Sequence, residues 1–120
     1  MRLLTEEEGS ARLADFAAAE VASTLSRLVR MALLTRADAT ARLADFDAWR
    51  AAMSSPVDIG ASDARLAYIY VRRFDLGLRA PDALHLAIAR RLDATLVTLD
   101  RRLAAAGREL GVAVEVPTTP

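Results

Sequence analysis

The C-terminal third of the chain alternates between helix-forming and strand-forming segments, and this order constrains the fold more than any other feature. Segments 81–92 and 101–109 have helical patterns, 95–99 is a β-rich apolar run, and 112–116 contains alternating valines. The order helix–strand–helix–strand implies parallel strands joined by right-handed crossovers. We therefore predict an α/β fold in which 95–99 and 112–116 share a sheet, with 95–99 central because it is apolar throughout.

The preceding residues predict further helices. Thr35-Arg36-Ala37-Asp38 resembles a capping box, which opens a helix that ends at Ser54-Ser55-Pro56. Phe46, Trp49 and Met53 fall on one stripe of this helix, and such aromatic and methionine side chains are typical of interfaces. The other expected elements are a short helix starting at the capping box Thr5-Glu6-Glu7-Glu8, a helix from Asp15 through Leu34, a short strand or extended link over 57–59, and a helix from Ser62 or Asp63 to about Phe74.

Length and composition bound the class of protein. A chain of 120 residues, 53% of them hydrophobic and 27% charged, can form one globular domain but not two. We expect a single domain over 1–120, with 117–120 as a loose tail. The longest run without a charged residue has seven residues, whereas a membrane span needs about 20. With no signal peptide recognisable at the start, we expect no membrane association and a cytoplasmic location.

Charge and cysteine content exclude several kinds of site. The chain contains no cysteine, which excludes disulfides, thiolate metal sites and a cysteine nucleophile. Its formal net charge is zero, so a nucleic acid would have to be held by a local patch rather than by bulk charge. The arginine pairs 72–73, 90–91 and 101–102 are either phosphate contacts or ordinary solvated faces.

Three acidic residues stand apart by their context. Glu20 lies in an otherwise apolar helical stretch, Asp82 starts the helix over 81–92, and Asp100 follows strand 95–99 directly. Ligands of parallel sheets gather at the carboxyl ends of the strands, where Asp100 lies. Carboxylates without cysteine partners suit a hard cation such as Mg²⁺ or Mn²⁺. The competing interpretation is that Asp82 and Asp100 are helix caps and that Glu20 faces solvent.

Two C-terminal motifs resemble a known family. The segment Leu78-Arg79-Ala80-Pro81-Asp82-Ala83-Leu84-His85-Leu86-Ala87, followed by Ala94-Thr95-Leu96-Val97-Thr98-Leu99-Asp100, resembles the C-terminal half of a PIN domain. The segment from Asp15 to Ser23, which contains Glu20, resembles an early helix of that family. The similarity extends from about residue 15 to Val116 and is greatest to VapC-type toxins of toxin–antitoxin modules.

The resemblance implies a fold, an activity and partners. It implies a three-layer α/β/α architecture with a reduced parallel sheet flanked by helices, and a Mg²⁺- or Mn²⁺-dependent endoribonuclease that hydrolyses RNA phosphodiester bonds. The family's catalytic acids map onto Glu20, Asp82 and Asp100, which would also be the metal ligands. Its hydroxyl before the last acid maps onto Thr98, which would be a further catalytic residue. His85, one turn after Asp82, is either a neighbour of the site or a packed helix residue. The implied partners are an RNA substrate, a cognate antitoxin and a second copy of the chain, to which Tyr68 and Tyr70 would contribute.

The beginning of the chain departs from the family pattern. PIN domains open with a strand that ends in a metal-binding Asp, and nothing in this sequence matches it. Residues 2–10 resemble the segment that follows that strand, and only Ala11 to Ala14 stand where a second strand is expected. A truncated reading frame, a natural deletion or a degenerate member would each give this pattern. We therefore expect weak or undetectable ribonuclease activity, and the alternative function is a catalytically inactive PIN-like module that dimerises or binds an antitoxin.

Overall fold

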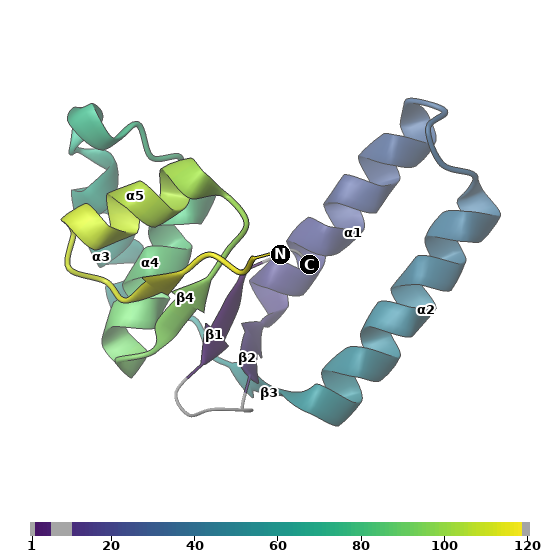
Figure 1. The fold of residues 1–120 in the computed structure, drawn as a ribbon, viewed down its shortest axis with the longest axis horizontal. Helices are drawn as coiled ribbons and strands as arrows, with labels where there is room; N and C mark the ends of the chain where they lie inside the picture. The colour runs from purple at the N-terminus through teal and green to yellow at the C-terminus, as the bar shows by residue number, and fades with distance from the viewer. Residues whose placement is uncertain (1, 6–10, 119–120) are drawn as a thin grey trace.

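The computed structural model describes residues 2–5 and 11–118, and in this part of the chain it contains a mixed sheet with helices beside it (Figure 1). The strands are β1 (Leu3–Thr5), β2 (Ala11–Ala14), β3 (Ser54–Val57), β4 (Thr95–Val97) and β5 (Val114–Glu115). The helices are α1 (Asp15–Arg30), α2 (Arg36–Met53), α3 (Ala61–Val71), α4 (Ala80–Leu92) and α5 (Arg101–Glu109), with a short 3₁₀ helix, η1, at Phe74–Leu76. The predicted α/β class is confirmed.

The sheet has the order β3-β2-β1-β4-β5 and is parallel at both ends. Strands β2 and β3 pair in parallel, as do β4 and β5, which confirms that the two C-terminal strands share a sheet. Strand β1 runs antiparallel to both of its neighbours, with Leu3 opposite Val97 and Thr5 opposite Thr95. The start of β1 therefore lies at the carboxyl end of β4.

Two expectations for the N-terminal residues are wrong. Thr5 is the last residue of β1 rather than the cap of a helix, while Glu6, Glu7 and Glu8 lie outside the described residues. The second strand, expected to be missing, is present as Ala11–Ala14. Both strands are too short to show a periodicity of their own, and they are held by pairing with β3 and β4.

Helix α4 forms the centre of the hydrophobic core. Ala83, Leu86, Ala87 and Ile88 on this helix are at most 1% exposed. Helix α3 packs along it, and an ion pair between exposed Arg91 and buried Asp63 joins the two helices, with Arg91 Nε 2.8 Å from Asp63 Oδ1. Because α4 is fixed in this way, the position of its first turn, which carries Asp82, is fixed as well.

The predicted caps fix the starts of two helices. The Thr35 hydroxyl accepts a hydrogen bond from the amide of Asp38, as the capping box predicts. Asp100 accepts hydrogen bonds from the amides of Arg102 and Leu103 and begins α5. No helix in the described part of the chain is long and apolar enough to cross a membrane.

Candidate functional site

Glu20, Asp82 and Asp100 line one open cavity of about 310 Å³. Glu20 comes from the second turn of α1, Asp82 from the first turn of α4, and Asp100 from the link between β4 and α5. Local propensity does not bring these elements together, so the shared cavity is a property of the tertiary fold. The other lining residues are Arg2, Leu76, Gly77, Leu78, Arg79, Pro81, Arg102 and Leu103.

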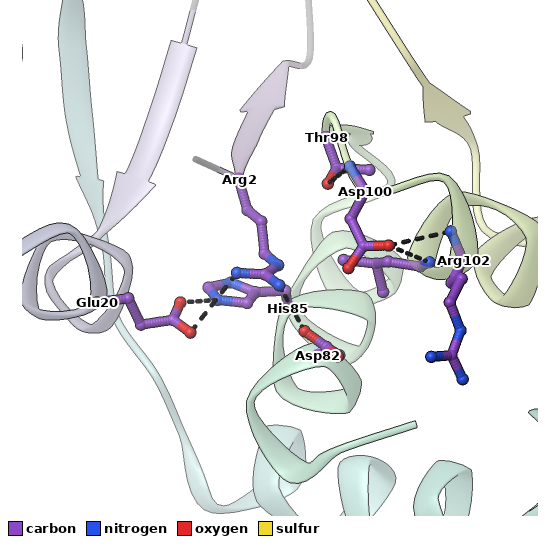
Figure 2. Close-up of polar contacts among 8 residues, drawn as sticks. Arg2, Glu20, Asp82, His85, Thr98, Asp100 and Arg102 are labelled. Carbon is purple, nitrogen blue, oxygen red and sulfur yellow. Dashed lines mark hydrogen bonds and ion pairs between the residues drawn. The ribbon is translucent and has the colours of Figure 1, made fainter. Parts of the chain in front are cut away.

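An arginine lies between two of the three acids (Figure 2). Arg2 Nη2 lies 2.6 Å from Asp82 Oδ1, and Arg2 Nη1 lies 3.6 Å from Glu20 Oε2. The side chains of Arg2, Glu20 and Asp82 are largely withdrawn from solvent, with exposed fractions of 18–26%. The guanidinium thus compensates the charge of two carboxylates that would otherwise repel one another.

His85 is a buried neighbour of Glu20. Its Nε2 contacts Glu20 Oε1, and its ring lies 5.8 Å from the ring of Phe16 on the same helix as Glu20. The imidazole is only 4% exposed. Burial lowers the pKa of His85 below its ordinary value, although the contact with Glu20 acts in the opposite direction. Both sequence interpretations of His85 therefore hold, because it is a packed helix residue and a direct neighbour of the site.

Asp100 has different partners from the other two acids (Figure 2). Its Oδ1 accepts hydrogen bonds of 3.0 Å from the Arg102 amide and 3.1 Å from the Leu103 amide. Its own amide donates to the hydroxyl of Thr98, which is buried directly after β4. The cap interpretation of Asp100 is thus correct, and it coexists with a place in the cavity wall. Thr98 fixes the turn that directs Asp100.

Two further arginines line the cavity, so its wall contains three arginines and three acids. Arg79 and Arg102 are both exposed, and Arg102 packs over Gly77. A Cβ at Gly77 would lie 3.4 Å from Arg102 Nη2, and the positive φ of 60° at this position also favours glycine. Exposed guanidinium groups beside carboxylates suit a phosphate-bearing ligand. Of the other predicted arginine contacts, Arg73 pairs with Asp75 and Arg91 with Asp63.

The donor chemistry of the cavity fits a hard divalent cation. Glu20, Asp82 and Asp100 present carboxylate oxygens, the ligands that Mg²⁺ and Mn²⁺ prefer. Within residues 2–5 and 11–118, however, no group of three or more His, Cys, Asp or Glu side chains lies together in an arrangement that holds a metal ion. Arg2 contacts two of the three candidate ligands and the helix amides bind the third.

Sequence reasoning missed Arg2. A lone arginine near the start of a chain has no motif, and its position depends on the antiparallel direction of β1. The contact of His85 with Glu20 had a partial signal, because positions i and i+3 share a helix face and place His85 beside Asp82.

The geometry agrees with a comparison to protein families. The model of the PIN domain matches residues 2–109, which is most of the chain and includes all three acids and Thr98. No curated protein matches the sequence.

Proposed function

This chain belongs to the PIN-domain family, whose members are generally metal-dependent nucleases, and we propose that it is a Mg²⁺-dependent endoribonuclease of the VapC toxin type. The observation that carries the proposal is the common cavity of Glu20, Asp82 and Asp100, with Arg79 and Arg102 in its wall. Carboxylates suit the cation, and exposed arginines suit the phosphates of an RNA strand. We assign the activity to a single cytoplasmic domain.

In this proposal each residue has a distinct task. Glu20, Asp82 and Asp100 are the metal ligands, and a bound Mg²⁺ or Mn²⁺ would compensate phosphate charge and lower the pKa of a water molecule. Arg79 and Arg102 bind the phosphates on either side of the scissile bond. Thr98 holds the Asp100 turn and His85 holds Glu20, so both are positioning residues rather than catalytic ones.

A second function is favoured by one observation. Arg2 already compensates Glu20 and Asp82, so the acidic site is stable in a form that does not engage a metal ion. A PIN-like module in this form would act by dimerising or by binding an antitoxin. For the ribonuclease itself, the same contact predicts weak rather than robust cleavage.

Asp100→Asn separates catalysis from stability. Asparagine caps helices about as well as aspartate, so α5 should remain capped while the carboxylate charge is lost. We expect cleavage of a fluorescent RNA in Mg²⁺ by the wild type, loss of that cleavage in Asp100→Asn, and no change in thermal unfolding beyond about 0.5 kcal/mol.

Asp38→Asn is the matched control, because Asp38 lies in the first turn of α2, outside the cavity. It should leave cleavage unchanged. Equal cleavage by the wild type and Asp100→Asn would contradict the proposal. If neither the wild type nor a variant without the Arg2 charge cleaves RNA, the ribonuclease proposal is overturned and the binding module remains.

A further inference from the structure

Arg2 reaches the acidic cavity because of the direction of β1. The strand is antiparallel to β4, with Leu3 opposite Val97, so the residue before Leu3 lies at the carboxyl end of β4. This is the end of the sheet at which Asp100 follows the strand and ligands of α/β sheets gather. The position of Arg2 among the acids therefore follows from the direction of β1 in the sheet.

The contacts of Arg2 are those of a cation held by two ligands. Its two terminal nitrogens point to different carboxylates, at 2.6 Å from Asp82 and 3.6 Å from Glu20. Its Nε is buried and has no hydrogen-bond partner among the described residues. The contacts with the two carboxylates therefore hold the guanidinium in a buried position in which the Nε–H donor makes no hydrogen bond. A surface ion pair would not require this burial.

A divalent metal ion and Arg2 would compete for the same oxygens. Asp82 Oδ1 accepts the shorter of the two Arg2 contacts, and a hard cation bound at this site needs carboxylate oxygens at 2.0–2.6 Å. Two cations cannot occupy the space between the same two carboxylates, because their charges repel and the atoms overlap.

We propose that Arg2 is the resident cation of this site and that a divalent metal ion binds Glu20 and Asp82 only by displacing it. Metal loading is then coupled to release of the Arg2 side chain from these two carboxylates. This inference rests on the proposed metal site, but it concerns the occupancy of that site rather than RNA cleavage. Arg2 is a regulatory residue of the acidic cavity.

Arg2→Gln tests this exchange by metal binding instead of activity. Glutamine keeps a polar side chain but removes the competing charge. We expect Mn²⁺, measured by calorimetry and by electron paramagnetic resonance, to bind Arg2→Gln about tenfold more tightly than wild type, because no charged hydrogen bond must first be broken. Arg2→Lys, which retains the charge, should bind Mn²⁺ as weakly as wild type.

Arg50→Gln is the matched control. Arg50 Nη2 lies 2.8 Å from Asp15 Oδ1, an ion pair of similar length that lies on the surface outside the cavity, so its loss should leave Mn²⁺ binding unchanged. Adding Glu20→Gln and Asp82→Asn to Arg2→Gln should abolish the gain.

A measurement on the wild type covers the case in which Arg2→Gln does not fold. The Nε–H resonance of Arg2, assigned by its absence in Arg2→Lys, should move progressively as Mg²⁺ is added. A resonance that stays unchanged while Mg²⁺ or Mn²⁺ binds at Glu20 and Asp82 would overturn the inference.

The outcomes distinguish this inference from the proposed function. Equal Mn²⁺ affinity of wild type and Arg2→Gln, still dependent on Glu20 and Asp82, overturns the inference and leaves the nuclease proposal standing. Tighter binding by Arg2→Gln without any RNA cleavage supports the inference and overturns the nuclease proposal. Absence of binding in every variant overturns both.

Discussion

At the residue scale, His85 links the acidic cavity to the stability of the fold. Its imidazole faces Glu20 and the Phe16 ring from α1, and Asp82 and the Arg2 guanidinium contribute to its electrostatic surroundings. Burial is the largest influence on this group and lowers its pKa. The folded state therefore binds the His85 proton more weakly than the unfolded state does.

This difference predicts a pH dependence of unfolding. The unfolded chain begins to bind the proton near pH 6.5, while folded His85 does so only at lower pH. The free energy of unfolding should thus fall as the pH is lowered below about 6.5, where the unfolded state takes up more protons. Urea denaturation between pH 5.5 and 7.5 measures the slope.

The control for this prediction is His85→Gln, which retains a polar side chain without a titrating group. Its free energy of unfolding should be nearly constant over the same range. Asp63, whose pKa is lowered through its contacts with Arg91 and Gly60 against the opposing effect of burial, titrates at lower pH and does not contribute here. An identical slope in the variant would assign the pH dependence to other groups.

Which residues of the site could be predicted depends on whether their signal is local. Asp82 and Asp100 stand at helix starts that proline and capping patterns indicate, and Glu20 interrupts an apolar run. Arg2 had no such signal, because its partners lie 18 and 80 residues away and meet it only after β1 pairs with β4. The presence of Arg2 beside these acids is therefore determined by the tertiary fold and has no local signal in the sequence.

At the element scale, the contact of α5 with β5 depends on the absence of a side chain. A Cβ on Gly107 would lie 2.6 Å from Val114 Cγ2 and 2.9 Å from Leu86 Cδ2. Helix α5 can therefore lie against β5 and α4 at this distance only with glycine at position 107.

Gly107→Ala should consequently destabilise the protein although alanine favours helices. Helix propensity alone would contribute about 1 kcal/mol of stability, but overpacking of a tight contact typically costs about 1–3 kcal/mol. We expect a net loss, measured as a lower midpoint of thermal unfolding. Ala105→Gly, at an exposed position of the same helix, should lower the free energy of unfolding by about 1 kcal/mol. This variant measures the contribution of helix propensity without a change in packing. A variant Gly107→Ala more stable than wild type would contradict the packing argument.

The predictability of the elements follows the same logic as that of the residues. The helices expected at 81–92 and 101–109 match α4 and α5 within one residue, because caps and apolar stripes are local. The parallel pair β4 and β5 followed from element order. Strands β1 and β2 could not be predicted, because segments as short as Leu3–Thr5 become strands only through their neighbours in the sheet.

At the scale of the whole molecule, α1 and α2 form a hairpin that projects away from the helices packed beside β4 (Figure 1). Helix α2 buries only Ala39 among its residues. Phe46 and Trp49 stack with ring centroids 6.1 Å apart and remain partly exposed, and Met53 is 58% exposed. Of the tyrosine pair expected at an interface, Tyr70 is instead buried in the core, whereas Tyr68 is exposed.

A second copy of the chain is the partner that we predict for this hairpin. Aromatic and methionine side chains are enriched at interfaces, where burial removes their apolar surface from water. Light scattering over a range of concentrations should give twice the monomer mass of 12.9 kDa for the wild type. The double variant Trp49→Ser, Met53→Ser should shift to the monomer with unchanged far-ultraviolet circular dichroism. Phe74→Ser, at an exposed position of η1 outside the hairpin, should remain dimeric. A wild type that stays at 12.9 kDa at the highest concentration would show that the projecting hairpin does not join two copies, and would favour a different protein as its partner.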